Sequence, residues 1–364
     1  MRVCLISMEI FAWGKHGGFG RATRIIGREL ARRGVQVFAV VPRRADQRPV
    51  EQLDGITVLG FEPAMPWGAV PMLQSCNADV YHSEEPSFTT WLAQRAMPDR
   101  KHIVTLRDTR ELGDWMTELR YPSLNRLQVL TNFLYEDSIL VRRAVRRADR
   151  VFCAAEFLRA KGARKYQLQT EPELLPTPVV VPAEVRKSVH ATVCYLARWD
   201  RRKRPELFLG LAGKFPQVRF VALGRSRDPD YDRRLRERYA GIPNLEMPGH
   251  LDQFGSSGLT NLLSESWIMV NTAHREGLPN AFIEAGAHGC AILSAVDPDG
   301  FASRFGAHVP DDDFAGGLAH LLNGGEWRAR GERARAYIRE TFELESAMAR
   351  HLAIYAELTA ERPR

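Results

Sequence analysis

The sequence lacks several features that would place it in a common class of protein. No uncharged apolar run approaches the ~20 residues that a membrane-spanning helix needs, and no repeat or low-complexity tract occurs. Five cysteines are scattered singly along the chain, and no two of the ten histidines stand four residues apart. We therefore expect no disulfide framework, no zinc knuckle and no metal site. With 45% apolar and 26% charged residues, the composition is globular.

The positive charge lies entirely in the first part of the chain. Residues 1–190 hold 28 Lys and Arg against 21 Asp and Glu, whereas residues 191–364 hold 23 of each, which accounts for the net charge of +7. This bias fits contact with an anionic membrane surface or another acidic partner, and it also fits simple solubility. The arginines of Arg142–Arg147 are open to the same two interpretations. Because no aromatic residues interleave with them, we expect no nucleic-acid binding.

The first residues, Met1–Ser7, form a short strand-like run without the apolar stretch of a signal peptide. We therefore expect a cytoplasmic protein, which would be peripheral at the inner face of the membrane if its basic half binds lipid.

Short β-branched runs alternate with amphipathic stretches, and one long helix is predicted over Leu124–Ala148. This alternation is typical of α/β proteins with parallel sheets, here two doubly wound Rossmann-like domains facing a central cleft. Prolines within Leu174–Pro182 indicate a boundary between residues 1–182 and residues 183–341. Strands are expected at Val3–Ser7, Val35–Val41, Ile56–Leu59, Val80–His82, Ile103–Leu106 and Val151–Ala154, and again at Thr192–Leu196, Arg219–Leu223, Leu245–Met247, Ile268–Asn271 and Ala291–Ser294.

Two glutamates stand out after the expected strand Ile268–Asn271. Glu276 falls in the loop before a helix, and Glu284 lies two turns further along the chain. Carboxylates suit sugar or ribose hydroxyls, and the backbone N–H groups of Gly277 and Leu278, at the expected helix N-terminus, suit an anion. A surface acid and a salt-bridged helix acid would give the same spacing.

Two further loops could contact a ligand. Arg198 and Lys203 follow the first strand of the second domain, where two cations can converge on a pyrophosphate, whereas Arg201, Arg202 and Arg204 are assigned to the surface. The loop Lys15-His16-Gly17-Gly18 precedes the first helix, and its glycines would let backbone approach a ligand closely. Either loop could equally be an ordinary surface loop or tight turn.

On these motifs, Glu276-Gly-Leu-Pro-Asn-Ala-Phe-Ile-Glu284 above all, the sequence resembles glycosyltransferase family 4, retaining nucleotide-sugar transferases of the GT-B fold. The resemblance implies that Glu276 contacts the donor sugar and Glu284 the ribose. It also implies that Arg198 and Lys203 stabilise the leaving diphosphate, and that Gly17 and Gly18 lie near the donor phosphates. Lys15 is similar to the lysine of a Lys-x-Gly-Gly loop in glycogen synthases. The resemblance further implies that the last helix, within 342–364, packs back on the first domain.

Three residues are acceptor-side candidates: His82, Arg107 and Asp108. Arg107 stands where many members of that family carry a histidine that touches the donor sugar. The sugar preference of those members therefore cannot simply be assigned to this sequence. Asp108 could instead cap a helix or loop, and His82 could be a structural residue at the end of a strand.

The sequence thus predicts a retaining glycosyltransferase of the hexosyltransferase type. It would move a sugar from a nucleoside-diphosphate sugar to a hydroxyl of a glycan, a lipid-linked compound or a small molecule, without a metal or other cofactor. Two alternatives share the fold, a nucleotide-sugar epimerase and a non-catalytic nucleotide-sugar-binding protein. Neither the nucleotide, the sugar nor the acceptor follows from these motifs.

Overall fold

The protein consists of two compact units, seen in a computed structural model that describes residues 1–14, 17–44, 46–251 and 254–360. Unit 1 comprises Met1–Glu111, Leu130–Pro178 and the chain from Leu344 onward. Unit 2 comprises Leu112–Val129 and Val179–Glu343. The main junctions thus fall after Pro178 and after Glu343. No sequence pattern anticipated that Leu112–Val129 belongs to unit 2.

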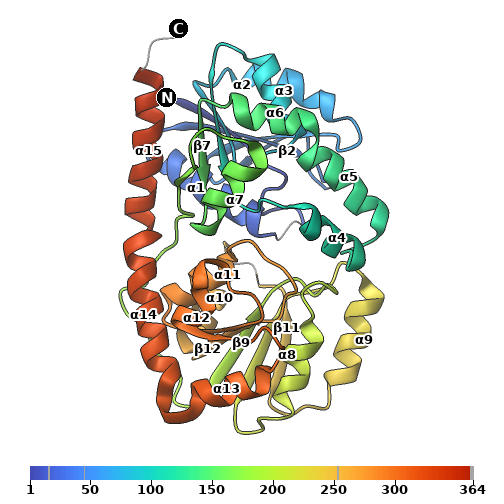
Figure 1. Ribbon diagram of the computed structural model, residues 1–364, viewed down its shortest axis with the longest axis vertical. Coiled ribbons are helices and arrows are strands. Elements are labelled where there is room, and N and C mark those ends of the chain that lie inside the picture. Colours follow the sequence, from blue (N-terminus) through green and yellow to red (C-terminus); the bar gives the residue numbers. More distant parts are fainter. Residues whose placement is uncertain (15–16, 45, 252–253, 361–364) are drawn as a thin grey trace. The chain divides into compact units, whose positions relative to one another are not determined.

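Unit 1 contains an eight-stranded sheet in the order β3-β4-β2-β1-β5-β6-β7-β8 (Figure 1). All neighbouring strands are parallel except β3 and β4, which pair antiparallel. The strands are β1 (Arg2–Ile6), β2 (Gln36–Pro42), β3 (Val50–Leu53), β4 (Ile56–Phe61), β5 (Val80–Ser83), β6 (Lys101–Leu106), β7 (Arg150–Cys153) and β8 (Glu173–Leu174).

Unit 2 contains a fully parallel six-stranded sheet in the order β11-β10-β9-β12-β13-β14. All eleven predicted strands occur in the two sheets, and of the strands within the described residues the sequence patterns missed the short or edge strands β3, β8 and β14. The strands of unit 2 are β9 (Thr192–Leu196), β10 (Arg219–Leu223), β11 (Leu245–Gly249), β12 (Ile268–Asn271), β13 (Ala291–Ser294) and β14 (Gly306–His308).

Helices connect the strands of both sheets. Those of the first half are α1 (Gly18–Arg32), α2 (Ala69–Cys76), α3 (Phe88–Ala96), α4 (Leu112–Arg120), α5 (Arg126–Asp137), α6 (Ile139–Arg147) and α7 (Phe157–Tyr166). Those of the second half are α8 (Pro205–Ala212), α9 (Pro229–Tyr239), α10 (Gly258–Glu265), α11 (Asn280–Ala287), α12 (Phe301–Phe305), α13 (Phe314–Leu322), α14 (Glu326–Thr341) and α15 (Leu344–Ala360).

The single long helix predicted over Leu124–Ala148 is wrong: two helices, α5 and α6, occupy this stretch. The break falls at Ser138, whose φ of −67° and ψ of 163° are extended and place it at the N-cap of α6. The Ser138 side chain makes no capping hydrogen bond, so the break is seen in the backbone conformation, which the apolar periodicity does not reveal.

Each sheet reverses its strand order once. In unit 1 the chain moves outward from β1 to β2 and then returns to place β5 on the other side of β1; in unit 2 it does the same around β9 and β12. The loops that follow two such adjacent strands diverge to opposite faces and leave a crevice at the carboxyl edge of the sheet, where ligands bind in open α/β folds. The loops after β9 and β12 therefore mark the expected ligand site of unit 2.

Apolar side chains fill both units on each side of their sheets. The cysteines are all buried, free thiols. In unit 1, α15 packs against the sheet and against α1: the Tyr355 hydroxyl lies 2.7 Å from Nδ1 of His82, and Glu345 pairs with Arg33 at 2.7 Å. None of the helices in the described residues is both long and apolar enough to cross a bilayer.

Candidate active site

The loop after β12 carries Glu276 at the switch point of unit 2. Its carboxylate accepts a hydrogen bond from Nδ2 of Asn271, the last residue of the strand, at 3.4 Å. It also forms an ion pair with the Lys203 ammonium, which comes from the loop after β9. Both side chains are mostly buried, 16% and 13% exposed. The structure thus joins two predicted site residues that lie far apart in the sequence.

The other members of the glutamate motif follow along this loop and α11. Because Pro279 is extended (φ −66°, ψ 130°), α11 begins only at Asn280. The sequence pattern places the N–H groups of Gly277 and Leu278 at the N-terminus of the helix. In the structure they belong instead to the loop that precedes it. Glu284 is half-buried on α11 itself.

Asp200 organises the loop after β9. Its Oδ1 accepts the backbone N–H of Lys203 at 3.1 Å, and its Oδ2 lies 3.9 Å from Nη2 of Arg198. Burial alone would raise the pKa of this carboxyl, but Arg198, Arg202 and Lys203 together hold it below its ordinary value. Asp200 is therefore an ionised, buried anchor for the two predicted phosphate-binding cations. No sequence pattern singles out this residue.

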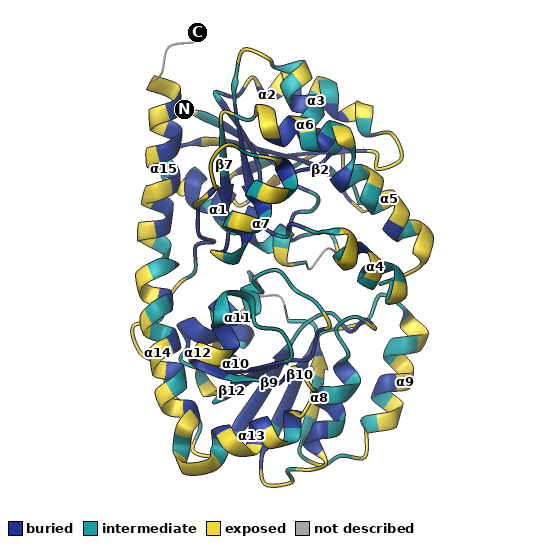
Figure 2. Cartoon of the chain, in the orientation of Figure 1, coloured by how far each residue is buried: buried dark blue, intermediate teal, exposed yellow. Residues whose placement is uncertain are grey.

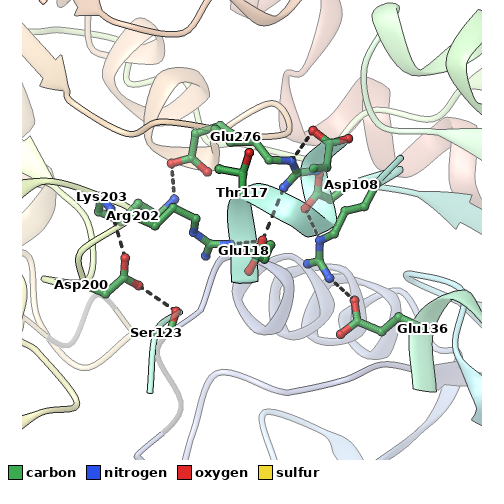
Figure 3. A network of polar contacts seen from close by, with 12 residues as sticks. Asp108, Thr117, Glu118, Ser123, Glu136, Asp200, Arg202, Lys203 and Glu276 are labelled. Carbon is green, nitrogen blue, oxygen red and sulfur yellow. Dashed lines mark hydrogen bonds and ion pairs between the residues drawn. The ribbon is translucent and has the colours of Figure 1, made fainter. Parts of the chain in front are cut away.

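The segment Leu112–Val129 of unit 2 contacts both of these loops (Figure 3). The Glu118 carboxylate pairs with Arg202 and lies 3.7 Å from Nη1 of Arg275; these side chains are about one-tenth exposed. Asp114 holds the same Arg275 at 2.7 Å. The residues held in this way are the immediate chain neighbours of Lys203 and Glu276.

Two contacts made by uncharged side chains of this segment, Ser123 and Tyr121, reinforce its link to the loops. The Ser123 hydroxyl donates to Oδ2 of Asp200 at 3.2 Å, and the Tyr121 ring stacks on His274 with 4.3 Å between centroids. The backbone N–H of His274 donates in turn to the carbonyl of Arg202 at 3.0 Å.

The surface assignment of Arg202 and Arg204 is wrong. The side chains of Arg202 and Arg204 are each 11% exposed. Arg202 pairs with Glu118, and Arg204 makes a two-pronged pair with Asp312, with Nη2 and Oδ1 2.7 Å apart. Only Arg201 fits the original assignment, because it is exposed.

The glycine loop lies in unit 1, after β1 and at the start of α1. Gly17 is the N-cap of that helix and Gly18 its first residue, whereas Lys15 and His16 lie outside the described residues. A Cβ on Gly17 would lie 1.6 Å from Oε1 of Glu9, so a larger residue here would displace that carboxylate. The same oxygen accepts the N–H of Gly20 at 3.4 Å, and a carboxylate of the chain itself therefore interacts with the start of this helix.

His82 and Arg107 meet at the buried carboxylate of Glu84. Arg107 donates to it through Nε at 2.9 Å, and Nδ1 of His82 lies 3.4 Å from it. The second nitrogen of His82 lies 2.7 Å from the Thr105 hydroxyl. Burial, the largest effect, lowers the pKa of His82 to about 4, so the ring is neutral at pH 7. An acceptor reaching His82 would have to displace one of these partners.

Asp108, the third acceptor-side candidate, lies beside a second buried acid. Its backbone N–H donates to Oε2 of Glu85 at 3.1 Å, and its side chain accepts from Nε of Arg110 at 3.1 Å. Burial and the nearby Asp108 raise the pKa of Glu85 to about 8. The acceptor role of His82, Arg107 and Asp108 remains a prediction.

Comparison with known families identifies both halves of the chain. Residues 16–181 match the model of Glycosyltransferase Family 4, and residues 190–323 match that of Glycosyl transferases group 1. The chain belongs to the family 4-like glycosyltransferases. A search of curated proteins found no match.

Solved structures of glycosyltransferases share the fold of this one. A sucrose-phosphate synthase from Thermosynechococcus elongatus superposes with a TM-score of 0.73 at 17% identity, covering 99% of both chains. HepE from Anabaena, in complex with UDP-glucose, gives 0.68 at 12% identity over 97% of this chain and 99% of its own. A glycosyltransferase from Rickettsia africae gives 0.66 at 14% identity over 98% of both. The predicted GT-B fold and the family 4 resemblance are thereby confirmed.

Proposed function

We propose that this glycosyltransferase moves a hexose from a nucleoside-diphosphate sugar to a hydroxyl group, with retention of configuration at the anomeric carbon. The observation that carries the proposal is the ion pair between Lys203 and Glu276 at the switch point of unit 2. It brings together the residue proposed to bind the diphosphate and the residue proposed to bind the sugar.

The charges around this pair suit a diphosphate. Arg198 is 30% exposed and Lys203 13%, and both are anchored by the ionised Asp200. In this structure, Glu276 neutralises Lys203. A diphosphate would compete with Glu276 for the ammonium while it gained contacts with Arg198, and such charge-assisted bonds contribute on the order of 1.5–3 kcal/mol each.

In the proposed reaction, the bond between the anomeric carbon and the diphosphate oxygen breaks, and the diphosphate leaves with the electron pair. The acceptor oxygen forms its new bond to the same carbon, and its proton goes to the departing diphosphate. Arg198 and Lys203 stabilise the charge that develops on the leaving group, which is the kind of electrostatic effect that dominates many enzymatic rate enhancements. This scheme needs no metal or other cofactor.

Five other predicted residues complete the proposal. Glu284 would hold the ribose hydroxyls, the loop at Gly277 and Leu278 would contact the donor, and the backbone at Gly17 and Gly18 would approach its phosphates. The acceptor is a hydroxyl of a glycan, a lipid-linked compound or a small molecule. HepE, solved with UDP-glucose, makes UDP-sugars the first donors to test.

The test combines nucleotide binding with transfer. UDP, GDP, ADP and dTDP are titrated calorimetrically against the wild type, Lys203→Ala, Glu276→Gln and, as a control from the same loop, the exposed Arg201→Ala. Lys203→Ala should weaken binding of the preferred nucleotide. Glu276→Gln should strengthen it about tenfold, or ~1.4 kcal/mol, because Lys203 is no longer neutralised. The same variant should lose sugar transfer.

Nucleotide affinity that falls in Lys203→Ala and rises in Glu276→Gln is specific to a ligand that competes with Glu276 for Lys203. If Lys203→Ala binds every nucleotide as well as the wild type does, the proposed donor site is wrong. If the preferred donor is converted to another nucleotide sugar without any acceptor, the protein is an epimerase instead.

A further inference from the structure

Helix α5 has an inverted amphipathic character in its unit 1 part. Leu130 and Leu134 lie one turn apart on one face and are 50% and 65% exposed. The last two residues of the helix, Glu136 and Asp137, are instead 9% and 4% exposed. A helix on the surface of a protein in water normally buries its leucines and exposes its acids. Figure 2 shows the exposed stretches along α5.

The buried acids of α5 are fixed inside unit 1. Glu136 pairs with Arg110, and Asp137 pairs with Lys165 at 2.9 Å and with Arg142 at 3.1 Å. Burial lowers the pKa of Lys165, although Asp137 opposes this effect. The acids thus hold α5 in this orientation, and they contribute little negative charge to its outer surface.

Helix α6, which follows α5 after Ser138, carries exposed basic residues. Its exposed residues are Ile139, which is 73% exposed, and three arginines at helical spacing, Arg143, Arg146 and Arg147. Val141, Ala144 and Val145 occupy its buried face. Arg146 donates to the Gln167 side chain, and none of the three arginines makes an ion pair within the described part of the chain.

We propose that the α5–α6 face, defined by Leu130, Leu134, Ile139, Arg143, Arg146 and Arg147, docks on an anionic lipid surface. The apolar side chains would enter the boundary between headgroups and acyl chains, and the arginines would contact lipid phosphates. Leucine and arginine side by side on an interfacial helix are the combination that binds anionic bilayers without spanning them.

Two observations favour lipid over a second copy of the chain. Three aliphatic side chains cover far less than the ~800 Å² per partner that a standard protein interface buries. A second copy would present the same face, whose α5 acids are buried and paired, and so would offer the arginines no negative charge from that helix. A lipid headgroup layer instead supplies the negative charge that the face lacks.

The experiment measures co-sedimentation of the full chain with vesicles. One set consists of phosphatidylcholine alone, and the other of phosphatidylcholine and phosphatidylglycerol in equal parts. Each arginine near an anionic surface is worth about fivefold in affinity (~1 kcal/mol). Replacing Arg143, Arg146 and Arg147 by Gln should therefore weaken binding to the second set on the order of a hundredfold. The Leu130→Gln/Leu134→Gln variant should bind at least tenfold more weakly.

Exposed arginines of unit 2 provide a control of equal charge. The triple variant Arg234→Gln/Arg333→Gln/Arg339→Gln should bind as the wild type does, and thermal melting checks that each variant is folded. Equal binding of the wild type to both vesicle types would overturn the proposal. So would undiminished binding by the folded leucine variant, or a concentration-dependent dimer that this variant loses while no protein sediments with vesicles.

Discussion

Replacing Glu118 by Gln tests whether the segment Leu112–Val129 holds the donor loops in place. The Glu118 carboxylate is shared by Arg202 and Arg275, and neither arginine is proposed to touch the substrate. Glutamine keeps the size of the side chain but removes its charge. Arg275 retains Asp114 at 2.7 Å, whereas Arg202 makes no other ion pair within the described part of the chain.

The magnitude follows from the burial of these groups. Removing one partner of a fully buried ion pair costs ~3–5 kcal/mol. Here the side chains of both arginines are about one-tenth exposed, and in the Glu118→Gln variant only Arg202 would lose its ion-pair partner. We therefore expect a loss of about 2 kcal/mol in the free energy of unfolding, near the value of one hydrogen bond to a charged group. Urea unfolding of the purified chain measures it.

If Glu118 positions the loops that carry Lys203 and Glu276, its replacement should have a second effect that a loss of stability alone would not produce. Because Arg202 precedes Lys203 and Arg275 precedes Glu276, loosening them should raise the dissociation constant of the nucleotide and lower kcat in the folded variant. The matched control is Glu237→Gln, whose side chain is 69% exposed in the same unit. If Glu118→Gln is destabilised but keeps wild-type nucleotide affinity and kcat, the segment has only a structural role.

Two further predictions concern unit 1. Gly17→Ala should cost about 1 kcal/mol of stability because its Cβ displaces the Glu9 carboxylate from the start of α1, and the same change in a Glu9→Ala background should cost almost nothing by urea unfolding. Glu85 has its pKa raised to about 8, so the folded state holds a proton that the unfolded state releases above pH 4.5. Stability should therefore fall as pH rises between these values, by up to ~1.4 kcal/mol per unit. Glu85→Gln should flatten this dependence in melting curves; an unchanged slope would contradict it.

The sequence patterns located the sheets well because parallel strands buried on both faces are continuous apolar runs. β12, with the sequence Ile-Met-Val-Asn, is such a run, and it has the predicted bounds. The edge strand β3, with the sequence Val-Glu-Gln-Leu, is half exposed and carries no such signal. The break between α5 and α6 is an extended backbone conformation at a single residue, Ser138, and apolar periodicity carries no signal for it.

The site was predictable where a motif is local. Glu276 and Lys203 could be singled out because each stands in a strand-to-helix loop, and adjacent parallel strands bring such loops to one edge of a sheet. Asp200 was missed because a single acid among basic residues looks like ordinary charge alternation. Glu118 could not be predicted from the sequence, because its partners lie far along the chain and no periodicity encodes an ion pair between distant segments.

The loop after β9 shows why charge patterns alone could not decide function. Arg201 is exposed, Arg202 binds Glu118, Lys203 binds Glu276 and Arg204 binds Asp312, although the four residues are consecutive. What separates them is the carboxylate that each one meets. For Arg202 and Arg204 this carboxylate lies outside the motif that resembles the family, so the pairing fixes the loop. For Lys203 this carboxylate, Glu276, lies within the motif. The same type of ion pair therefore holds the Lys203 ammonium at the proposed diphosphate site. Removing the Glu276 charge should strengthen nucleotide binding and abolish sugar transfer.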